Sequence, residues 1–296
     1  MTPFPAGTPI EIAPDVRLVR ADNPSPMTHW GTNTFLVGRG AVAVIDPGPA
    51  LPHHLEAILA ALAPGERISH IFVTHAHMDH SPLARPLAEA TGAPVLAFGP
   101  AGSGRSVRMT GLAGLEGGEG VDRAFTPDAA LADGMAVESD HWRLAALHTP
   151  GHMGGHLCFA LGDLLFSGDH VMGWAPSLVS PPEGDMTDYM AQLERLREGG
   201  WHRLLPAHGA MIDDPEERIA GLITHRRARE AAILAALAPG PADLTTLTAL
   251  VYQDVAPALL PAARRNLLAH LVDLIHRGAA ARADDAPLPE TRFHLL

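Results

Sequence analysis

The stretch His75-Ala76-His77-Met78-Asp79-His80 decides how the rest of this 296-residue chain is interpreted. It directly follows residues 71–74 (IFVT), an apolar and β-branched run that predicts a strand. Side chains at the end of a strand stand on a rigid edge, and two residues that are two positions apart share one face of an extended segment. Imidazole nitrogens suit zinc, and a nearby carboxylate suits the same ion or a second one. This stretch alone suggests a metal site.

Three further segments bring the same residue types to the ends of predicted strands. They are residues 148–152 (HTPGH), 166–170 (FSGDH) and 205–209 (LPAHG). A single segment of this kind is explained as well by a capping aspartate or a loop histidine with a hydrogen-bond partner. Four strand ends that all deliver histidine or aspartate supply enough ligands for two metal ions. Together they predict a metal centre.

The overall composition excludes several classes of protein. Hydrophobic residues make up 47% and charged residues 18% of the chain, which is typical of a folded globular protein. We expect no membrane span, because no stretch approaches the roughly 20 apolar residues that a span requires. We also expect no secretory signal, because residues 1–7 (MTPFPAG) offer neither a basic nor an apolar region. A net charge of −12 argues against a protein that coats nucleic acid. The single cysteine, Cys158, cannot form an internal disulfide, and this favours a cytoplasmic location.

The first two hundred residues alternate short strands with helices. Strands are predicted at residues 16–20, 32–37, 41–45, 68–74, 94–98, 142–147, 156–161, 164–167 and 203–206, and helices at 51–62, 82–90 and 186–197. The glycine-rich residues 99–120 are interpreted as a mobile lid or, equally, as an ordinary solvated loop. Runs of strands with helices between and after them indicate sheets that are covered by helices.

The composition changes near Asp213, where we place a boundary between a catalytic domain (residues 1–212) and a C-terminal domain (residues 213–296). Helices are predicted at residues 215–237, 244–254 and 261–277, and residues 279–296 have room for two short strands. Three helices followed by a small hairpin are the pattern of a winged helix.

The four segments in this order resemble the metallo-β-lactamase superfamily of dinuclear metal hydrolases, over about residues 10–212. Residues 23–34 and 225–234, with the helices that follow, are similar to its β-lactamase-like branch with a C-terminal winged helix. That branch includes a mitochondrial single-strand endoribonuclease and fungal thioesterases that act on polyketide carrier proteins. The resemblance implies an α+β fold: a four-layer αββα sandwich followed by a small, mostly helical winged-helix domain.

The resemblance also implies a role for each candidate residue. The first metal would be held by His75, His77 and His152, the second by Asp79, His80 and His208, and Asp169 would bridge the two. His156 and Asp46 would either orient these ligands from behind or have plain structural roles. The implied cofactors are two divalent metal ions per chain. We expect zinc, although iron and manganese accept the same ligands.

These ligands predict a hydrolase that uses a hydroxide bridging the two metals, with Asp79 handling the proton. The expected substrate is a carboxylic ester, thioester, lactone or lactam, either as a small molecule or bound to a carrier. No Gly-x-Ser-x-Gly elbow is present, and the lone Cys158 lies in an apolar strand, so no serine or cysteine nucleophile is expected. The alternatives are a single-strand endoribonuclease of the same fold and a nucleic-acid-binding regulator whose catalytic part has lost its function.

The charge pattern favours acyl-bond hydrolysis over RNA cleavage. The chain is only 5% aromatic, and Arg105 and Arg108 are the only arginine pair near the metal segments, which is a thin track for phosphates. Residues 261–277 carry three arginines (Arg264, Arg265 and Arg277) and one acidic residue, Asp273, so their positive charge is small. For the C-terminal domain we therefore expect packing on the catalytic domain, formation of a homodimer or closure over the active site, rather than binding of nucleic acid.

Overall fold

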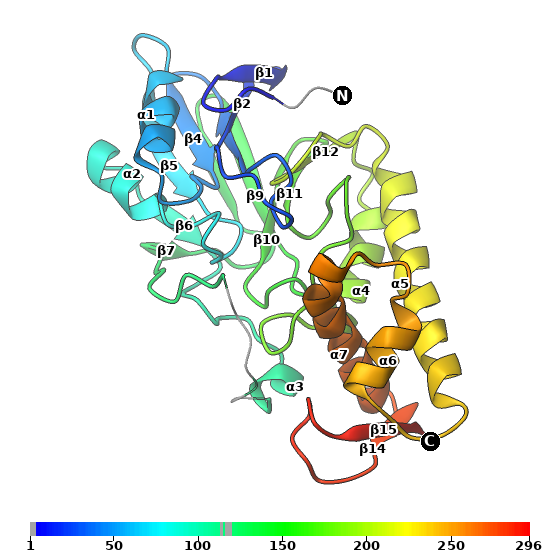
Figure 1. The fold of residues 1–296 in the computed structure, drawn as a ribbon. Helices are drawn as coiled ribbons and strands as arrows, with labels where there is room; N and C mark the ends of the chain where they lie inside the picture. Colours follow the sequence, from blue (N-terminus) through cyan, green and yellow to red (C-terminus); the bar gives the residue numbers. More distant parts are fainter. Residues whose placement is uncertain (1–3, 113–114, 116–119) are drawn as a thin grey trace.

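The computed structural model describes residues 4–112, 115 and 120–296. Two β-sheets pack face to face, and helices cover their outer faces (Figure 1). The first sheet has the order β1 (Ile10–Ala13), β2 (Val16–Arg20), β3 (Asn33–Val37), β4 (Ala41–Ile45), β5 (Arg67–Phe72), β6 (Val95–Ala97) and β7 (Ala129–Ala130). The second has the order β12 (Arg203–Pro206), β11 (Leu164–Gly168), β10 (Leu157–Leu161), β9 (Trp142–His148) and β8 (Ala136–Ser139).

Strand direction within each sheet determines where the loops gather. Strands β1 to β4 pair antiparallel, whereas β4 to β7 pair parallel. In the second sheet only β11 and β12 are parallel. Parallel neighbours end at the same edge, so the loops after β4 and β5, and those after β11 and β12, lie at shared edges.

Three buried clusters define the layers of the sandwich. Between the sheets, aromatic side chains interlock; the largest are Phe35, Phe72, Trp142, Phe159 and Phe166. Helices α1 (Pro52–Ala60) and α2 (Ala84–Thr91) bury apolar residues against the outer face of the first sheet. Helices α4 (Met186–Arg197) and α5 (Pro215–Leu237) do the same on the second sheet. The predicted αββα sandwich is confirmed.

The structure contains several short elements that the sequence did not predict. Strands β1, β7 and β8 lie at sheet edges and are partly or fully exposed, so they lack the apolar runs that mark a buried strand. A short helix, α3 (Val107–Thr110), begins where the Ser106 hydroxyl accepts a hydrogen bond from the Met109 amide. It lies within the stretch predicted to be a lid or a loop, of which residues 113–114 and 116–119 fall outside the described residues.

The C-terminal residues form the predicted winged-helix pattern. After α5 come α6 (Leu244–Val251), a 3₁₀ turn (Pro257–Leu259) and α7 (Leu260–His276), with a small antiparallel sheet of β13 (Ala242–Asp243), β15 (Arg292–Leu295) and β14 (Ala280–Arg282). Leu247, Leu267, Leu271 and Phe293 form the centre of its own buried cluster. None of the described helices is both long and apolar enough to cross a membrane.

The C-terminal helices also share a core with the αββα sandwich. Ile219, Leu222 and Ile223 of α5 join Tyr189 and Leu193 of α4 in one buried cluster. Helix α7 contacts α4 as well, because the Thr187 hydroxyl donates a 2.6 Å hydrogen bond to Asp273. Each of these buried aliphatic side chains contributes about 1.5–3 kcal/mol, so the two parts are not independent in stability.

A chain truncated after Asp213 should therefore expose the outer face of α4 and associate through it. Light scattering coupled to size exclusion should show soluble aggregates or precipitation, whereas the full chain elutes as one discrete species. A truncated protein with the full chain's oligomeric state and thermal stability would contradict this.

His270 gives the C-terminal helices a dependence on pH. It is buried in α7, and neither ring nitrogen has a hydrogen-bond partner among the described residues. Burial lowers its pKa to about 3. Since an unfolded histidine titrates near 6.5, the unfolded chain binds the proton more readily than the folded one below that pH. The stability that the neutral ring contributes is therefore complete above pH 6.5 and is lost as the pH falls toward 3.

Replacing His270 by leucine should make the protein less sensitive to acid. Between pH 7 and pH 5 the wild type should lose about 2 kcal/mol more of its free energy of unfolding than His270→Leu does. Urea unfolding in the presence of a chelator, with both proteins at both pH values, measures this difference. Parallel losses in the two proteins would show that His270 does not titrate in this way.

Candidate metal centre

The seven predicted ligands come from four loops that meet at one edge of the sandwich. Residues 75–80 follow β5, His152 lies between β9 and β10, Asp169 follows β11 and His208 follows β12. The loop after β5 is tightly wound, because the amide of His80 donates to the carbonyl of His77 over 3.0 Å. The structure thus brings together all the residues that the sequence analysis selected as ligands.

Two glycines let the chain turn where the ligands are presented. Gly151 has a φ of +145°, and a Cβ there would lie 2.4 Å from the Cα of Tyr189. Gly168 has a φ of +52°, and a Cβ would lie 2.5 Å from Nε2 of His156. Any side chain at either position would collide with its neighbours. The residue after each glycine, His152 or Asp169, therefore has its place fixed by backbone packing.

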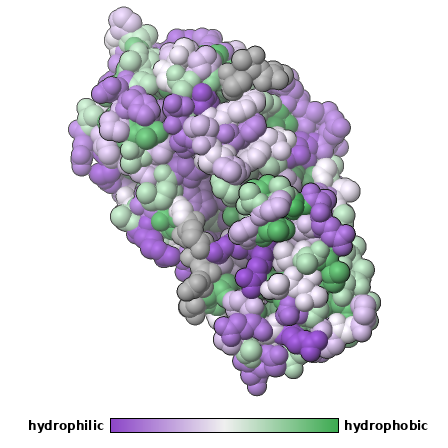
Figure 2. Space-filling model, viewed as in Figure 1, coloured by the Kyte–Doolittle hydropathy of each residue, from purple (hydrophilic) through white to green (hydrophobic). Residues whose placement is uncertain are grey.

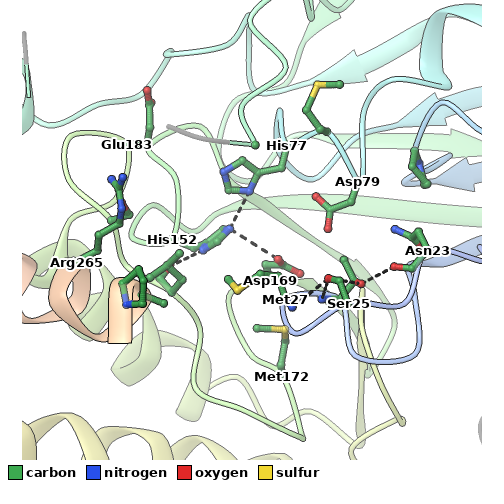
Figure 3. Close-up of a pocket in the computed structure, with 18 residues that line it drawn as sticks. Asn23, Ser25, Met27, His77, Asp79, His152, Asp169, Met172, Glu183 and Arg265 are labelled. Atoms are coloured by element: carbon green, nitrogen blue, oxygen red, sulfur yellow. Dashed lines mark hydrogen bonds and ion pairs between the residues drawn. The ribbon is translucent and has the colours of Figure 1, made fainter. Parts of the chain in front are cut away.

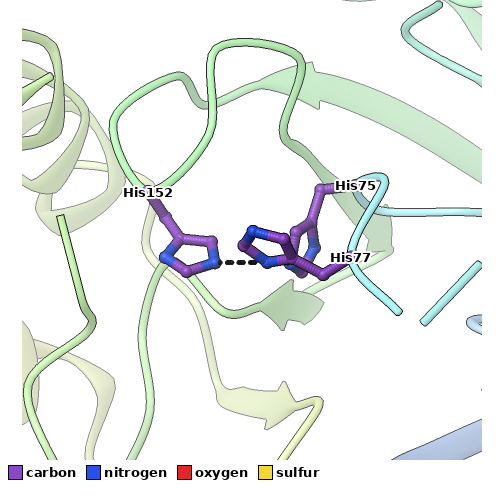
Figure 4. Close-up of side chains that lie close together, drawn as sticks. All are labelled: His75, His77 and His152. Atoms are coloured by element: carbon purple, nitrogen blue, oxygen red, sulfur yellow. Dashed lines mark hydrogen bonds between the residues drawn. The ribbon is translucent and has the colours of Figure 1, made fainter. Parts of the chain in front are cut away.

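Three histidines form the first cluster, which we call the histidine trio (Figure 4). Nδ1 of His77 lies 2.8 Å from Nε2 of His75 and 3.1 Å from Nε2 of His152. One ring nitrogen of each residue therefore points to a common centre. All three ligand atoms lie within 4.8 Å of one another, which is close enough for one metal ion to bind all three.

Asp79, His80 and His208 form the second cluster, which we call the mixed trio. Oδ2 of Asp79 lies 3.5 Å from Nε2 of His80 and 3.2 Å from Nε2 of His208. Asp169 stands between the two clusters: its carboxylate lies 3.4 Å from His208 and 3.7 Å from His80. It also lies 3.7 Å from His152 (Figure 3). Its carboxylate therefore lies close to candidate ligands of both trios.

Hydrogen bonds on the far side of the rings fix which nitrogen faces inward. Nδ1 of His152 donates to the carbonyl of Leu178 over 2.6 Å, and Nδ1 of His208 donates to that of Gly31 over 3.2 Å. Nε2 is thereby left as an acceptor that points into the site.

Asp46 orients one histidine of each trio. Its Oδ2 accepts hydrogen bonds from Nδ1 of His80 over 2.9 Å and from the hydroxyl of Thr74 over 2.7 Å. That hydroxyl in turn accepts from Nδ1 of His75 over 2.9 Å. The sequence predicted Asp46 as a supporting residue but missed Thr74, whose only signal is its place directly before His75.

His156 supports Asp169 from behind. Its Nδ1 donates to the hydroxyl of Thr149 over 2.8 Å, so its Nε2 can accept from the amide of Asp169 over 3.2 Å. The ring therefore bonds to the backbone of a candidate ligand and does not itself join either trio. This arrangement supports the orienting role more than a plain structural one.

Unpartnered buried atoms show that this site suits a cation. Among the described residues, Nε2 of His80, Nε2 of His208 and Oδ1 of Asp169 are buried without a hydrogen-bond partner. Such atoms cost free energy unless something binds them. All three face the space shared by the mixed trio and Asp169, so the donor set and its geometry fit metal binding.

The electrostatics of the two trios differ. Burial lowers the pKa of His77 to about 3 and that of His75 well below its usual value, so their rings are neutral and ready to bind metal. In the mixed trio burial opposes charge, yet the carboxylates of Asp79 and Asp169 raise the pKa of His80 well above its ordinary value and also raise that of His208. The two carboxylates thus favour the protonated imidazoles of His80 and His208, and a bound divalent ion would displace those protons.

A cleft of about 600 Å³ opens over the trios (Figure 3). Apolar side chains from several loops and from α7 line it, namely Met27, Pro49, Met78, Met172, Leu178, Pro261 and Ala262. On the molecular surface, the region between the sheets and the C-terminal helices is hollowed (Figure 2). The sequence predicted closure by the C-terminal domain as one alternative, but it did not identify Pro261, Ala262 or Arg265 in the lining.

Two arginines near the cleft, Arg105 and Arg108, are already paired with acidic groups. Arg105 forms a two-pronged ion pair with Glu183, and Arg108 pairs with Asp185 at 2.8 Å and Asp188 at 2.7 Å. These pairs tie α3 to the start of α4. The sequence analysis considered these two arginines as possible phosphate contacts. In the structure, acidic side chains of the protein itself neutralise them.

Comparisons with known proteins find matches to both parts of the chain. Residues 27–208 match the family model of the metallo-beta-lactamase superfamily, and residues 244–287 match that of the beta-lactamase associated winged helix domain. The lactamase-like protein adaB of Aspergillus niger is 31% identical over 240 residues, which cover 79% of this chain and 68% of that protein. The atrochrysone carboxyl ACP thioesterase dmxR1 of a Cryptosporiopsis species is 30% identical over 231 residues, or 77% of this chain and 64% of the relative.

A solved structure shows the same overall architecture. The crystal structure of a metallo-beta-lactamase family protein from Thermus thermophilus superposes with a TM-score of 0.76 at 25% identity. The match covers 97% of this chain and 100% of the other. It therefore includes the C-terminal helices as well as the sandwich.

Replacing Asp169 by alanine should weaken both metals together, whereas His77→Ala should weaken only one. The reason is that the Asp169 carboxylate lies within 3.7 Å of His152 in one trio and of His80 and His208 in the other. Chelator competition with the purified protein should show two weakened sites for Asp169→Ala, and one weakened site with a near-normal second for His77→Ala. One intact site in Asp169→Ala would rule out a bridging carboxylate.

Proposed function

This chain belongs to the metallo-beta-lactamase superfamily, and on that premise we propose that it is a dinuclear metal-dependent hydrolase of acyl bonds. The observation that carries the proposal is the convergence of seven ligand side chains, with unpartnered atoms facing inward, beneath a mainly apolar cleft. The substrate we propose is a carboxylic ester, thioester, lactone or lactam, free or bound to a carrier.

The histidine trio would hold one ion and the mixed trio the other, with Asp169 between them. Most of these ligands are imidazoles, which favours zinc, with iron and manganese as alternatives. When bound, two such ions would lower the pKa of a water molecule toward about 7 and stabilise negative charge on the substrate's oxygen.

The protein's own residues have two tasks in this proposal. Asp79 handles the proton: its side chain is 27% exposed, against 10% for Asp169, so among the acidic ligands it is the one that the cleft reaches best. Asp46, Thr74 and His156 keep the ligands oriented. Cys158 takes no part, because burial raises the pKa of its thiol to about 12.

The walls of the cleft favour an apolar acyl group. Met27 and Met78 each remain 48% exposed at the cleft although they are large and apolar, which suggests that a ligand covers them. Methionine side chains adapt to ligands of irregular shape. A relative named as an acyl carrier protein thioesterase supports a carrier-bound acyl substrate. The engaged Arg105 and Arg108 argue against single-stranded RNA.

The remaining expectations are parts of the same proposal. A cytoplasmic location suits a protein whose one cysteine is a buried free thiol. A homodimer and the division into residues 1–212 and 213–296 stay predictions. The shared core of α4 and α5 supports a C-terminal domain that packs on the catalytic domain.

Short-chain acyl thioesters, esters and lactones should be hydrolysed by the metal-loaded protein, and a fluorogenic single-stranded RNA should not. Asp79→Ala should lower kcat/KM by about 100-fold or more, because it removes a ligand and the proton carrier together. Asp163→Ala, an exposed aspartate in the turn between β10 and β11, is the matched control and should keep full activity. Cleavage of RNA alone, abolished by Asp79→Ala, would establish the nuclease alternative instead.

A further inference from the structure

Helix α5 buries an arginine without a carboxylate partner. Arg226 is 2% exposed, and within the described part of the chain no acidic group lies within ion-pair distance of it. Its guanidinium instead donates to the carbonyl of Ser177 and, over 3.1 Å, to Oδ1 of Asn266, and it stacks on the ring of Tyr189 at 5.1 Å. A buried charge is costly, so these neutral partners must be held firmly in place.

Asn266 of α7 completes this contact. The same Oδ1 that accepts from Arg226 also accepts from the amide of Val179 over 3.0 Å. Arg226 and Asn266 together therefore hold the carbonyl of Ser177 and the amide of Val179. Those two backbone groups flank Leu178, so its peptide units are fixed on both sides.

Leu178 is the residue whose carbonyl orients His152. That carbonyl accepts from Nδ1 of His152 over 2.6 Å, and Nε2 of the same ring lies 3.1 Å from Nδ1 of His77. The hydroxyl of Ser177 adds a second link, a 3.0 Å hydrogen bond to the carbonyl of His170, the residue after Asp169. Helices α5 and α7 thus both reach the metal centre through one short loop.

We propose that Arg226 and Asn266 are positioning residues through which the C-terminal helices set the orientation of His152, and with it the metal affinity of the histidine trio. The proposal rests on the metal centre described under the proposed function and goes beyond it, because it gives the winged-helix domain a role in building that centre. The two residues form a clamp on residues 177–179 and are not among the described residues that line the cleft.

Arg227 is a natural comparison for the clamp. It follows Arg226 in the same helix but is exposed, and it pairs with Glu194 over 2.9 Å. Removing its charge should cost little, as is usual for a surface ion pair. Any effect that is specific to Arg226 therefore comes from its buried contacts rather than from helix α5 as such.

The test is a zinc titration against a chelating indicator, carried out on full-length protein in two backgrounds. His208→Ala leaves the histidine trio complete, and His77→Ala leaves the mixed trio complete. In the first background, Arg226→Met and Asn266→Leu should raise the zinc Kd about tenfold, the scale of loss expected when support of a ligand is removed. In the second background the change should stay below about twofold.

Two variants serve as controls. Asn266→Asp keeps an oxygen acceptor for Arg226 and Val179, and it should bind zinc as the parent does. Arg227→Met should also leave both affinities unchanged. Circular dichroism and thermal unfolding identify variants that do not fold, and the comparison of Asn266→Leu with Asn266→Asp decides the matter if Arg226→Met is one of them.

Unchanged affinity in Asn266→Leu, equal weakening in both backgrounds, or equal weakening by Asn266→Asp would each overturn the clamp. The wild-type titration separates this failure from failure of the proposed function. If the wild type binds no zinc, the metal centre itself is wrong; if it binds two ions and the variants do not differ, only the clamp is wrong.

Discussion

The convergence of imidazole and carboxylate groups at one edge of the sandwich is the constraint on which the rest of the structure depends. Each trio gathers its ligand atoms within 4.8 Å of one another, and three of the atoms that face inward are buried, among the described residues, without a partner. Such an arrangement is unfavourable in an isolated loop, because nothing offsets the loss of water. It persists here because the ligands stand at the ends of strands whose aromatic core locks the two sheets together.

Support for the ligands comes from increasingly distant parts of the chain. The nearest is Thr74, next to His75, followed by Asp46 at the end of the neighbouring parallel strand. Beyond these, the carbonyl of Leu178 bonds to His152 and is itself fixed by the C-terminal helices. Under the clamp proposal the winged-helix domain is therefore part of what shapes the site, in keeping with the α7 residues that line the cleft.

The clustering of the candidate ligands was predictable from the sequence because the information that places these side chains is local. His75, His77 and Asp169 follow apolar strands directly, and a strand end fixes the direction of its side chains within a few residues. The edge strands β1 and β8 were missed because half-exposed strands carry no apolar run. The contacts of Arg226 and Asn266 could not be predicted. Arg226 bonds to Ser177, 49 positions away, and Asn266 to Val179, 87 positions away. Both contacts use backbone groups of the loop, which no pattern of side chains reveals.

The central claim is that these residues hold two metal ions on either side of Asp169. A crystal of metal-saturated protein, with diffraction recorded on both sides of the metal's absorption edge, tests it most directly. We expect two anomalous peaks per chain, one within the histidine trio and one within the mixed trio, each next to the Asp169 carboxylate. A single peak, or peaks away from these residues, would contradict the claim.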